Sequence, residues 1–365
     1  MRVGLAIYGP LETVSGGYLY DYKLVERLRA EGDTVEIVSL PWRSYASHLL
    51  DNFSPSLQKR LLALQLDLLL QDELNHPSFF LINRRLAGRI PYPMVSIVHH
   101  LRGSEVHPAW QMPFYRLVER RYLQTISAFV FNSQTTRMAV QAALRDRRPL
   151  PAHVVAFPAG DRFSAQINVA ELTARARQPG PLRVLFLGSL IARKGLHTLL
   201  EALRRLPPSL ASLDVAGGES ADPGYARRMR RLADKPFLHG RVTFHGALDN
   251  EPLADLLRRS QVLALPSSYE GYGIAYLEGM SFGLPAIGGQ AGAAGEIISD
   301  GLDGFLVAPD DAARLAEVLT LLASDRGRLD EMSVAALQRF QSHPTWDDST
   351  GKIRHFLHTL LPPPG

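Results

Sequence analysis

The stretch Pro266-Ser267-Ser268-Tyr269-Glu270-Gly271-Tyr272-Gly273-Ile274-Ala275-Tyr276-Leu277-Glu278-Gly279-Met280-Ser281-Phe282-Gly283-Leu284-Pro285 decides how this 365-residue chain is interpreted. It follows an apolar run, residues 262–265, that predicts a buried strand. A strand that turns through Gly-Tyr-Gly into a helix leaves backbone N–H groups unpaired at the helix N-terminus, where an anion can bind. Glu270 in the loop and Glu278 in the predicted helix can face one pocket from different depths.

Strand-like and helix-like segments alternate on both sides of this stretch. Short apolar runs bounded by Gly, Pro or polar residues predict strands, and periodic apolar positions between them predict helices. Such alternation is typical of parallel sheets covered by helices. The expected strands are residues 2–8, 34–38, 79–82, 94–98, 128–131 and 154–157 in the first half, and residues 182–187, 213–216, 241–244, 262–265, 286–288 and 304–307 in the second half.

The two series of strands predict an α/β fold with two Rossmann-like domains of parallel sheet. A polar stretch, residues 173–181, ends in Pro-Gly-Pro and indicates a linker between the domains. We therefore expect an N-terminal domain of residues 1–165 and a C-terminal domain of residues 166–345. Residues 346–365 should supply an amphipathic helix that packs back on the first domain. Because ligands bind outside the carboxyl ends of parallel strands, we expect a ligand cleft between the two domains.

The composition is that of an ordinary globular protein. Hydrophobic residues make up 46% of the chain and charged residues 21%, which argues against intrinsic disorder. The sequence contains no Cys, which excludes disulfides, thiolate metal sites and a cysteine nucleophile. No apolar run approaches the roughly 18 residues of a membrane span, and residues 1–10 do not resemble a signal peptide. We expect a cytoplasmic protein.

Neither a metal ion nor a nicotinamide cofactor is indicated by the motifs. The chain contains no Asp-x-Asp pair, and we find no His, Asp or Glu cluster with metal-ligand spacing. Gly289, Gly292 and Gly295 are spaced evenly by three residues, unlike the G-x-G-x-x-G turn that follows a strand in dinucleotide-binding domains. We therefore expect no cofactor and no metal, and we reject a nicotinamide-dependent dehydrogenase.

The net charge of +4 is distributed unevenly. Residues 1–160 hold 18 basic and 13 acidic residues, whereas residues 161–365 hold 22 and 23. A bias towards Arg codons is one explanation, and an anionic partner of the first domain is the other. No nucleic-acid motif accompanies the basic residues, so nucleic acid is not expected. The basic residues of the first domain include Arg43, Lys59, Arg60, Arg84, Arg85, Arg89, Arg102, Arg116, Arg120 and Arg121.

Residues 266–285 resemble the signature of family 4 retaining glycosyltransferases, in which a Glu-Gly-aromatic-Gly loop opens a helix that bears a second Glu. Further motifs of that family occur in the same order along this chain. Those in the second half are specific and comprise residues 187–195, 215–218, 244–246, 292–296 and 300–305. Those in the first half are individually less specific and comprise residues 16–17, 98–100, 132–135 and 157–161. The resemblance implies a GT-B fold. It also implies transfer of a hexosyl group from a UDP- or GDP-sugar to a hydroxyl acceptor, with retention of anomeric configuration.

The resemblance also implies roles for individual residues of the donor site. Glu270 would bind hydroxyls of the donor sugar, Glu278 the nucleotide ribose, and Lys194 the diphosphate. One departure is Ser189, which stands where the family usually has Arg, so phosphate binding would rest on Lys194, the Ser189 hydroxyl and Arg193. The implied donor-binding residues are Gly16, Gly17, Ser189, Arg193, Lys194, His245, Gly271, Tyr272, Gly273, Ile274 and Glu278.

Two histidines end the expected strand 94–98 at the edge where ligands bind. By family position, His99 would lie near the reacting sugar, which makes His99 and Glu270 the candidate catalytic residues. His100 and Arg102 would lie on the side of the acceptor, a lipid or an anionic glycan. The excess of arginines is consistent with a peripheral contact with an anionic membrane face.

Other functions remain open at this level. The same architecture hosts nucleotide-sugar epimerases and phosphorylases, although the five lysines of the chain make a pyridoxal-dependent phosphorylase improbable. Ser189 also leaves open a non-catalytic subunit that binds sugar nucleotides.

Overall fold

The computed structural model describes residues 1–13, 16–105, 107–145, 149–163 and 167–361. These residues form two compact units. Unit 1 is Met1–Pro158 together with the C-terminal segment from Trp346 onward, and unit 2 is Ala159–Thr345. Among the described residues, no helix is both long enough and apolar enough to cross a membrane.

Unit 1 is built on a parallel six-stranded sheet with the order β2-β1-β3-β4-β5-β6. Its strands are β1 (Arg2–Tyr8), β2 (Thr34–Leu40), β3 (Leu68–Asp72), β4 (Met94–Val98), β5 (Ala128–Phe131) and β6 (Ala152–Val155). The helices around it are α1 (Gly16–Ala30), α2 (Tyr45–Leu50), α3 (Pro55–Ala63), α4 (His76–Phe79), α5 (Ile82–Leu86), α6 (Met112–Leu123), α7 (Gln134–Leu144) and α15 (Trp346–Thr359). Short 3₁₀ turns are η1 (Asp51–Phe53), η2 (Glu73–Asn75) and η3 (Arg102–Ser104).

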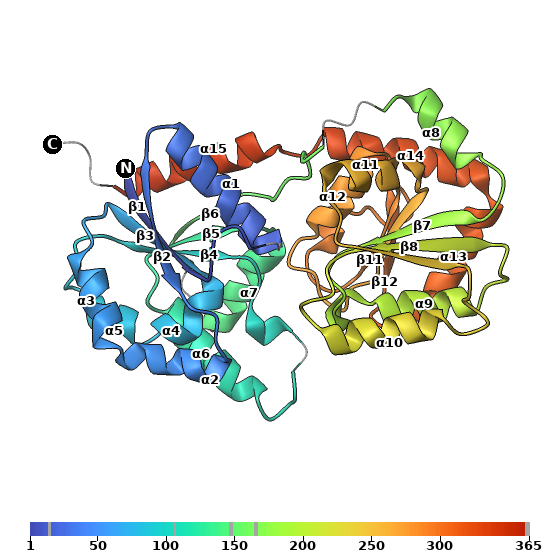
Figure 1. The fold of residues 1–365 in the computed structure, drawn as a ribbon. Coiled ribbons are helices and arrows are strands. Elements are labelled where there is room, and N and C mark those ends of the chain that lie inside the picture. The colour runs from blue at the N-terminus through green and yellow to red at the C-terminus, as the bar shows by residue number, and fades with distance from the viewer. Residues whose placement is uncertain (14–15, 106, 146–148, 164–166, 362–365) are drawn as a thin grey trace. The chain divides into compact units, whose positions relative to one another are not determined.

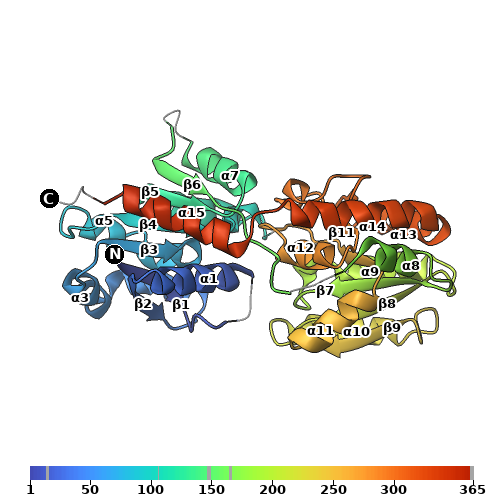
Figure 2. The ribbon, with the colours of Figure 1, turned by 90° about the horizontal axis from the view of Figure 1, so that it is seen from above.

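The terminal helix α15 lies alongside α1 in unit 1 (Figures 1 and 2). The indole of Trp346 is buried edge-on against Tyr20 of α1, with the ring centroids 5.9 Å apart. At the other end of the helix, Arg354 Nε donates to Asp33 Oδ2 at 2.7 Å. Both contacts join residues more than 300 positions apart, so the end of the chain completes the packing of its beginning.

Unit 2 is built on a second parallel six-stranded sheet with the order β12-β11-β10-β7-β8-β9. Its strands are β7 (Leu182–Leu187), β8 (Ala211–Ala216), β9 (Val242–Gly246), β10 (Val262–Leu265), β11 (Ala286–Gly289) and β12 (Gly304–Val307). Its helices are α8 (Val169–Ala176), α9 (Leu196–Arg204), α10 (Pro223–Ala233), α11 (Asn250–Arg259), α12 (Ile274–Ser281), α13 (Ala312–Ser324) and α14 (Arg326–Gln341), with 3₁₀ turns η4 (Ala192–Lys194) and η5 (Ala294–Glu296). The predicted class, α/β with two parallel sheets, is confirmed.

One predicted strand is wrong. Residues 79–82 are helical, at the end of α4 and the start of α5, and the strand between β1 and β4 is β3, residues 68–72. Pro77 fits the first turn of α4, where a backbone N–H is not needed. Strand β3 is buried along its whole length, so it has no polar alternation that would distinguish it from a helix. The strand expected at residues 154–157 lies two residues earlier, as β6.

The predicted linker, residues 173–181, is also partly wrong. Helix α8 occupies its first half and begins within a capping box, in which the Asn168 side chain accepts from the Glu171 N–H and the Glu171 side chain accepts from the Asn168 N–H. Leu172 and Ala176 are buried in unit 2. The polar residues Thr173 and Arg175 gave this segment the composition of a loop, but both face unit 2, where Arg175 donates to the Phe282 and Gly283 carbonyl oxygens.

Candidate functional site

The loop that follows β10 is held in a conformation that only Gly can adopt without strain. Gly273, the first residue before α12, has a φ of +109°, and a Cβ there would lie 2.4 Å from the Tyr276 ring. Gly292 of a neighbouring loop approaches so closely that its Cβ would lie 2.0 Å from the Glu270 carbonyl oxygen. That carbonyl accepts from the Ala293 N–H at 2.8 Å. The two loops therefore fix the backbone of Glu270 at the N-terminal side of α12.

The Glu270 side chain is buried and bound by cations from the loop after β7. Lys194 Nζ donates to both carboxylate oxygens, at 2.6 and 2.8 Å, and an Arg193 NH group lies 3.5 Å from one of them and 2.9 Å from the Tyr269 carbonyl oxygen. Burial lowers the pKa of Lys194, with a further contribution from Arg193, while Glu270 opposes the shift. Strands β7 and β10 are neighbours, so two positive groups and one carboxylate meet at the carboxyl edge of the sheet.

Glycines bring the loops of this edge together. Gly195 has a φ of +74°, and a Cβ there would lie 2.1 Å from the Pro266 carbonyl oxygen. A Cβ on Gly217, which follows β8, would lie 1.9 Å from the Gly188 carbonyl oxygen. Ser189 is half-buried in the loop between these contacts. The segment predicted to bind phosphate thus lies at the strand ends beside Glu270.

Glu278 lies on α12, buried and 3.6 Å from an Arg162 NH group. Burial raises its pKa, and Arg162 opposes the shift. Ile274 begins the same helix, and Gly271 and Tyr272 precede it. Tyr272 is buried with its hydroxyl 3.3 Å from His343 Nε2. Glu270 and Glu278 therefore have different partners, although one helix and its entry loop carry both.

His245 lies at the end of the edge strand β9. Its Nε2 is 2.6 Å from Asp214 Oδ1 on the adjacent strand β8, and both side chains are about 21% exposed. The role of His245 in donor binding stays a prediction, and Asp214 is the group that orients the imidazole.

In unit 1, His99 lies at the carboxyl end of β4 and is held from several sides. Its Nε2 is 3.1 Å from Asp21 Oδ1 on α1, and its ring packs edge-on against Tyr20 at 5.3 Å. Gly17 approaches so closely that a Cβ there would lie 3.1 Å from the ring, and Gly16 begins the same helix. The Asn132 side chain donates to the His99 carbonyl oxygen at 2.8 Å. The ring therefore has one orientation.

The charge of His99 is set by buried carboxylates. Burial by itself lowers the pKa of His99, but Asp21, Asp72 and Glu73 outweigh it and raise the value to about 9. Burial and Asp21 in turn raise the pKa of Asp72, with His99 opposing. The three carboxylates therefore favour the imidazolium form of His99. Sequence reasoning missed Asp21, Asp72 and Glu73; the signal for the last two was an acidic pair one residue beyond the apolar run 68–70.

A second buried cluster joins Glu73, His76 and Glu119. Burial raises the pKa of both glutamates, that of Glu119 to about 8, and lowers that of His76 to about 4. Two sets of ligand-type atoms lie within 4.8 Å of one another: those of Asp21, Asp72 and His99, and those of Glu73, His76 and Glu119. The expectation that no cluster has ligand spacing was wrong, because Glu73 and His76 are three residues apart on one turn. The absence of a metal stays a prediction.

The two acceptor-side residues lie beside this cluster. His100 Nε2 is 3.0 Å from Glu105 Oε1. The Arg102 guanidinium lies between two rings, 4.9 Å from the centroid of Tyr45 and 4.6 Å from that of Tyr115. Stacking between aromatic rings fixes the plane of a guanidinium while its NH groups can still bind an anion or a hydroxyl.

The structure brings Arg193, Lys194, Glu270 and the Gly271–Gly273 turn together in unit 2. In unit 1 it brings Gly17 and His99 together. The pairing of these two groups across a cleft stays a prediction.

Comparison with known proteins places the chain among glycosyltransferases. A family model described as glycosyl transferases group 1 matches residues 171–339. The GDP-mannose-dependent alpha-(1-6)-phosphatidylinositol monomannoside mannosyltransferase of Mycobacterium tuberculosis is 30% identical over 270 residues, which are 70% of this chain and 67% of that protein. The D-inositol 3-phosphate glycosyltransferase of Xylanimonas cellulosilytica is 32% identical over 173 residues, 47% of this chain but only 40% of that protein. Alignments with the first curated relatives thus span 40 to 67% of their lengths.

Among solved structures, the sucrose-phosphate synthase of Thermosynechococcus elongatus superimposes with a TM-score of 0.81 over 99% of both chains, at 20% sequence identity. At that identity the likeness establishes the fold, GT-B, and no more.

Proposed function

The chain belongs to the glycosyl transferases group 1 family, and on this premise we propose that it transfers a hexosyl group from a nucleoside-diphosphate sugar to a hydroxyl acceptor, with retention of anomeric configuration and without a metal ion. The observation that carries the proposal is the Lys194–Glu270 pair beside the N-terminus of α12. Two cations and a helix N-terminus suit a diphosphate. A buried carboxylate next to them suits the hydroxyls of a sugar.

We propose that donor binding rearranges this pair. The diphosphate competes with Glu270 for Lys194 and Arg193, and the released carboxylate accepts hydrogen bonds from the donor sugar. Glu278 accepts from the ribose hydroxyls, and its burial gives these bonds a low-dielectric setting. Ser189, Tyr272 and the N–H groups around Gly273 complete the contacts with the diphosphate and the sugar.

The reaction needs no protein nucleophile in this scheme. The bond from the anomeric carbon to the diphosphate oxygen breaks, the acceptor oxygen attacks from the same face, and its proton passes to the departing diphosphate oxygen. Negative charge that develops on the diphosphate is stabilised by Lys194 and the helix-terminal N–H groups. The imidazolium of His99 donates a hydrogen bond to the reacting sugar or to the acceptor.

A panel of labelled UDP- and GDP-sugars tests this function. Incubation with each donor and a lipid extract, followed by mass spectrometry, should show one donor consumed and one product heavier by a hexosyl unit. An epimerised free sugar nucleotide would instead establish an epimerase, which neither the family nor the named relatives favour. Tight donor binding without turnover on any acceptor would establish a binding subunit.

We further propose that the acceptor is anionic or lies at an anionic membrane face. The arginine excess of the first 160 residues supports this, and one relative is named for a phosphatidylinositol-based acceptor. Flotation with anionic liposomes should show binding that weakens at high salt, because exposed charges are screened. Equal recovery with neutral and anionic liposomes would contradict the proposal.

A further inference from the structure

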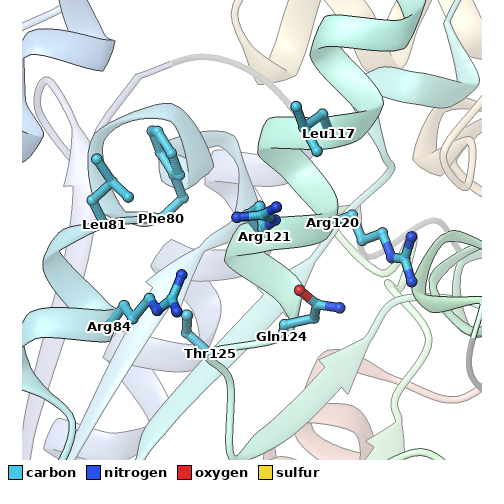
Figure 3. A pocket seen from close by; sticks show the side chains of 8 residues that line it. All are labelled: Phe80, Leu81, Arg84, Leu117, Arg120, Arg121, Gln124 and Thr125. Carbon is cyan, nitrogen blue, oxygen red and sulfur yellow. The ribbon is translucent and has the colours of Figure 1, made fainter.

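Three arginines of unit 1 line a pocket away from the residues described so far. Arg84 reaches the pocket from α5, and Arg120 and Arg121 reach it from α6. The pocket encloses about 520 Å³, and Gln124 and Leu117 also line it. In the view of Figure 3, Arg84 extends from one side, Arg121 stands in the middle, and Arg120 extends to the side away from Arg84.

The topology places this pocket at the opposite edge of the sheet from His99. Thr125, in the pocket wall, lies three residues before the first residue of β5, so the pocket lies at the amino end of that strand. Asn132, which binds the His99 carbonyl, follows the same strand at its carboxyl end. Strand β5 alone separates the two edges by about 13 Å, at 3.3 Å per residue. The pocket is therefore not the predicted sugar-transfer site.

Within the described part of the chain, none of the three guanidinium groups pairs with a carboxylate. The neighbouring Arg85 shows the contrast, since its NH1 donates to the Asn52 carbonyl oxygen at 2.6 Å and its guanidinium lies over Phe53. Nε of Arg120 is buried without a hydrogen-bond partner. Like charges that gather in one pocket repel one another unless an anion joins them.

The surrounding sequence does not supply that anion. Residues 80–125 contain seven arginines and two glutamates. Glu119 points away from the pocket, where it accepts from the Gly103 N–H at 3.3 Å, and burial raises its pKa to about 8. The other, Glu105, is engaged with His100 and His107. The local positive charge is thus available to a ligand.

The edge of the pocket is apolar. Leu117 is 52% exposed, and Phe114 and Trp110, which precede it by three and seven residues, are 46% and 80% exposed. Spacings of four, three and four residues put Trp110, Phe114, Leu117 and Arg121 on one face of α6 and the turn before it. The exposed stripe leads from two aromatic rings to the arginines.

We propose that the pocket binds a phosphate group, presented by an amphiphile whose apolar part lies along the Trp110–Phe114–Leu117 stripe. Planar guanidinium groups bind phosphate oxygens in pairs, and Arg84 and Arg121 enter from two different helices to do so. A phospholipid headgroup and a soluble phosphate ester share this chemistry. The assignment does not depend on sugar transfer, because the pocket and the proposed donor site lie in different units.

Calorimetric titration of the full-length protein tests the proposal with two probes, glycerol 3-phosphate and short-chain phosphatidylglycerol. The double variant Arg84→Gln/Arg121→Gln should bind at least about tenfold more weakly than the native protein, since it loses two charged hydrogen-bond donors to the phosphate. The matched control, Arg29→Gln/Arg89→Gln, removes two exposed arginines of unit 1 outside the pocket and should stay within about twofold of the native affinity.

Tighter binding of the lipid than of glycerol 3-phosphate supports the proposal, and comparable affinity for both probes overturns the role of the apolar stripe and leaves a site for soluble phosphate esters. No binding of either probe overturns the proposal. Equal losses in the pocket variant and the control also overturn it, because they show diffuse attraction by net charge. Donor consumption is assayed separately without lipid, so failure of sugar transfer remains distinguishable.

Discussion

Lys194 and Glu270 form an ion pair with each other, so a donor diphosphate must compete with the Glu270 carboxylate for the Lys194 ammonium group. The lysine must leave a carboxylate 2.6 Å away to bind a diphosphate, and its lowered pKa reflects a buried position that an anion would stabilise. The pair keeps both side chains oriented towards the carboxyl edge of the sheet, so the site is preorganised at the cost of a competing internal ion pair.

Replacing Lys194 therefore has a defined effect on nucleotide affinity. Lys194→Gln should weaken binding of the matching nucleoside diphosphate by about 10- to 100-fold, the equivalent of one charged hydrogen bond. Isothermal titration gives the affinity. Lys235→Gln is the control, since Lys235 is an exposed lysine of the same unit. Equal affinities for Lys194→Gln and Lys235→Gln would remove Lys194 from the donor site.

Asp21 should keep His99 charged. Asp21→Asn retains a hydrogen-bond acceptor but removes the negative charge, so the pKa of His99 should fall from about 9 towards or below its ordinary value. The folded-state pKa lies above the unfolded value of about 6.5, so the stability contributed by the charged pair is complete below pH 6.5 and is lost as the pH rises through 9.

NMR titration of the His99 ring measures this shift directly. The difference in unfolding midpoint between the native protein and Asp21→Asn should also be larger at pH 6 than above pH 9. Glu26→Gln on the same helix, where the carboxylate is exposed, should change neither quantity. A His99 pKa that is unaltered in Asp21→Asn would assign the shift to other groups.

At the scale of elements, the turn into α12 depends on Gly273. Gly273→Ala forces a non-Gly residue to a φ of +109° and places a methyl group 2.4 Å from Tyr276, so we expect a loss of about 1–3 kcal/mol in stability together with weaker donor binding. Gly240→Ala is the control, because Gly240 also has a positive φ but has no atom within 4 Å of a Cβ. Denaturant unfolding of both variants separates backbone strain from collision; equal losses would assign the whole effect to φ.

The elements that sequence patterns predicted well are those whose ends carry clear signals. The strands of unit 2 were expected within about two residues of their observed bounds, because each is a short apolar run closed by Gly, Pro or a polar turn. The turn at Gly271–Gly273 has a physical signature in its glycines and its position after a strand. Lys194 and His99 were identified as site residues from the resemblance to a family more than from the spacing of residues in the sequence.

Elements buried on all sides, or polar on their surface, were harder to predict. Strand β3 is buried along its whole length, including Gln71 and Asp72, and no strand was expected at residues 68–72, so Asp72 and Glu73 at its end were missed. The partners of His99 come from α1 and β3, far apart in sequence, and no local pattern shows that their side chains meet. Asp214 and Arg162 were missed for the same reason.

At the scale of the whole molecule, the C-terminal helix α15 belongs to unit 1, together with the first 158 residues of the chain. Trp346 starts α15 and packs on Tyr20, which itself packs on His99 and donates to the Ala156 carbonyl oxygen at 2.8 Å. The final helix is thus connected through one aromatic residue to the predicted catalytic histidine. A substitution that disrupts the packing of Trp346 should therefore change both the stability of unit 1 and the position of the His99 ring.

Trp346→Ala tests this connection. Truncation of a buried Trp should cost about 3–5 kcal/mol of unfolding free energy and should broaden or shift the NMR signals of His99. Trp110→Ala, which removes an indole that is 80% exposed, is the control and should change stability by less than about 0.5 kcal/mol. A Trp346→Ala protein as stable as the control would show that α15 is dispensable to unit 1.

Donor turnover by Glu270→Ala is the measurement that tests the central claim most directly. With the donor and acceptor found in the screen, Glu270→Ala should lower the rate of hexosyl transfer by about 100- to 1000-fold, while nucleoside-diphosphate affinity stays native or rises, because Lys194 remains and loses its competing carboxylate. The control is Glu331→Ala, which removes an exposed glutamate of the same unit and should transfer at the native rate. Native turnover in Glu270→Ala would contradict the assignment of the Lys194–Glu270 pair to the donor site.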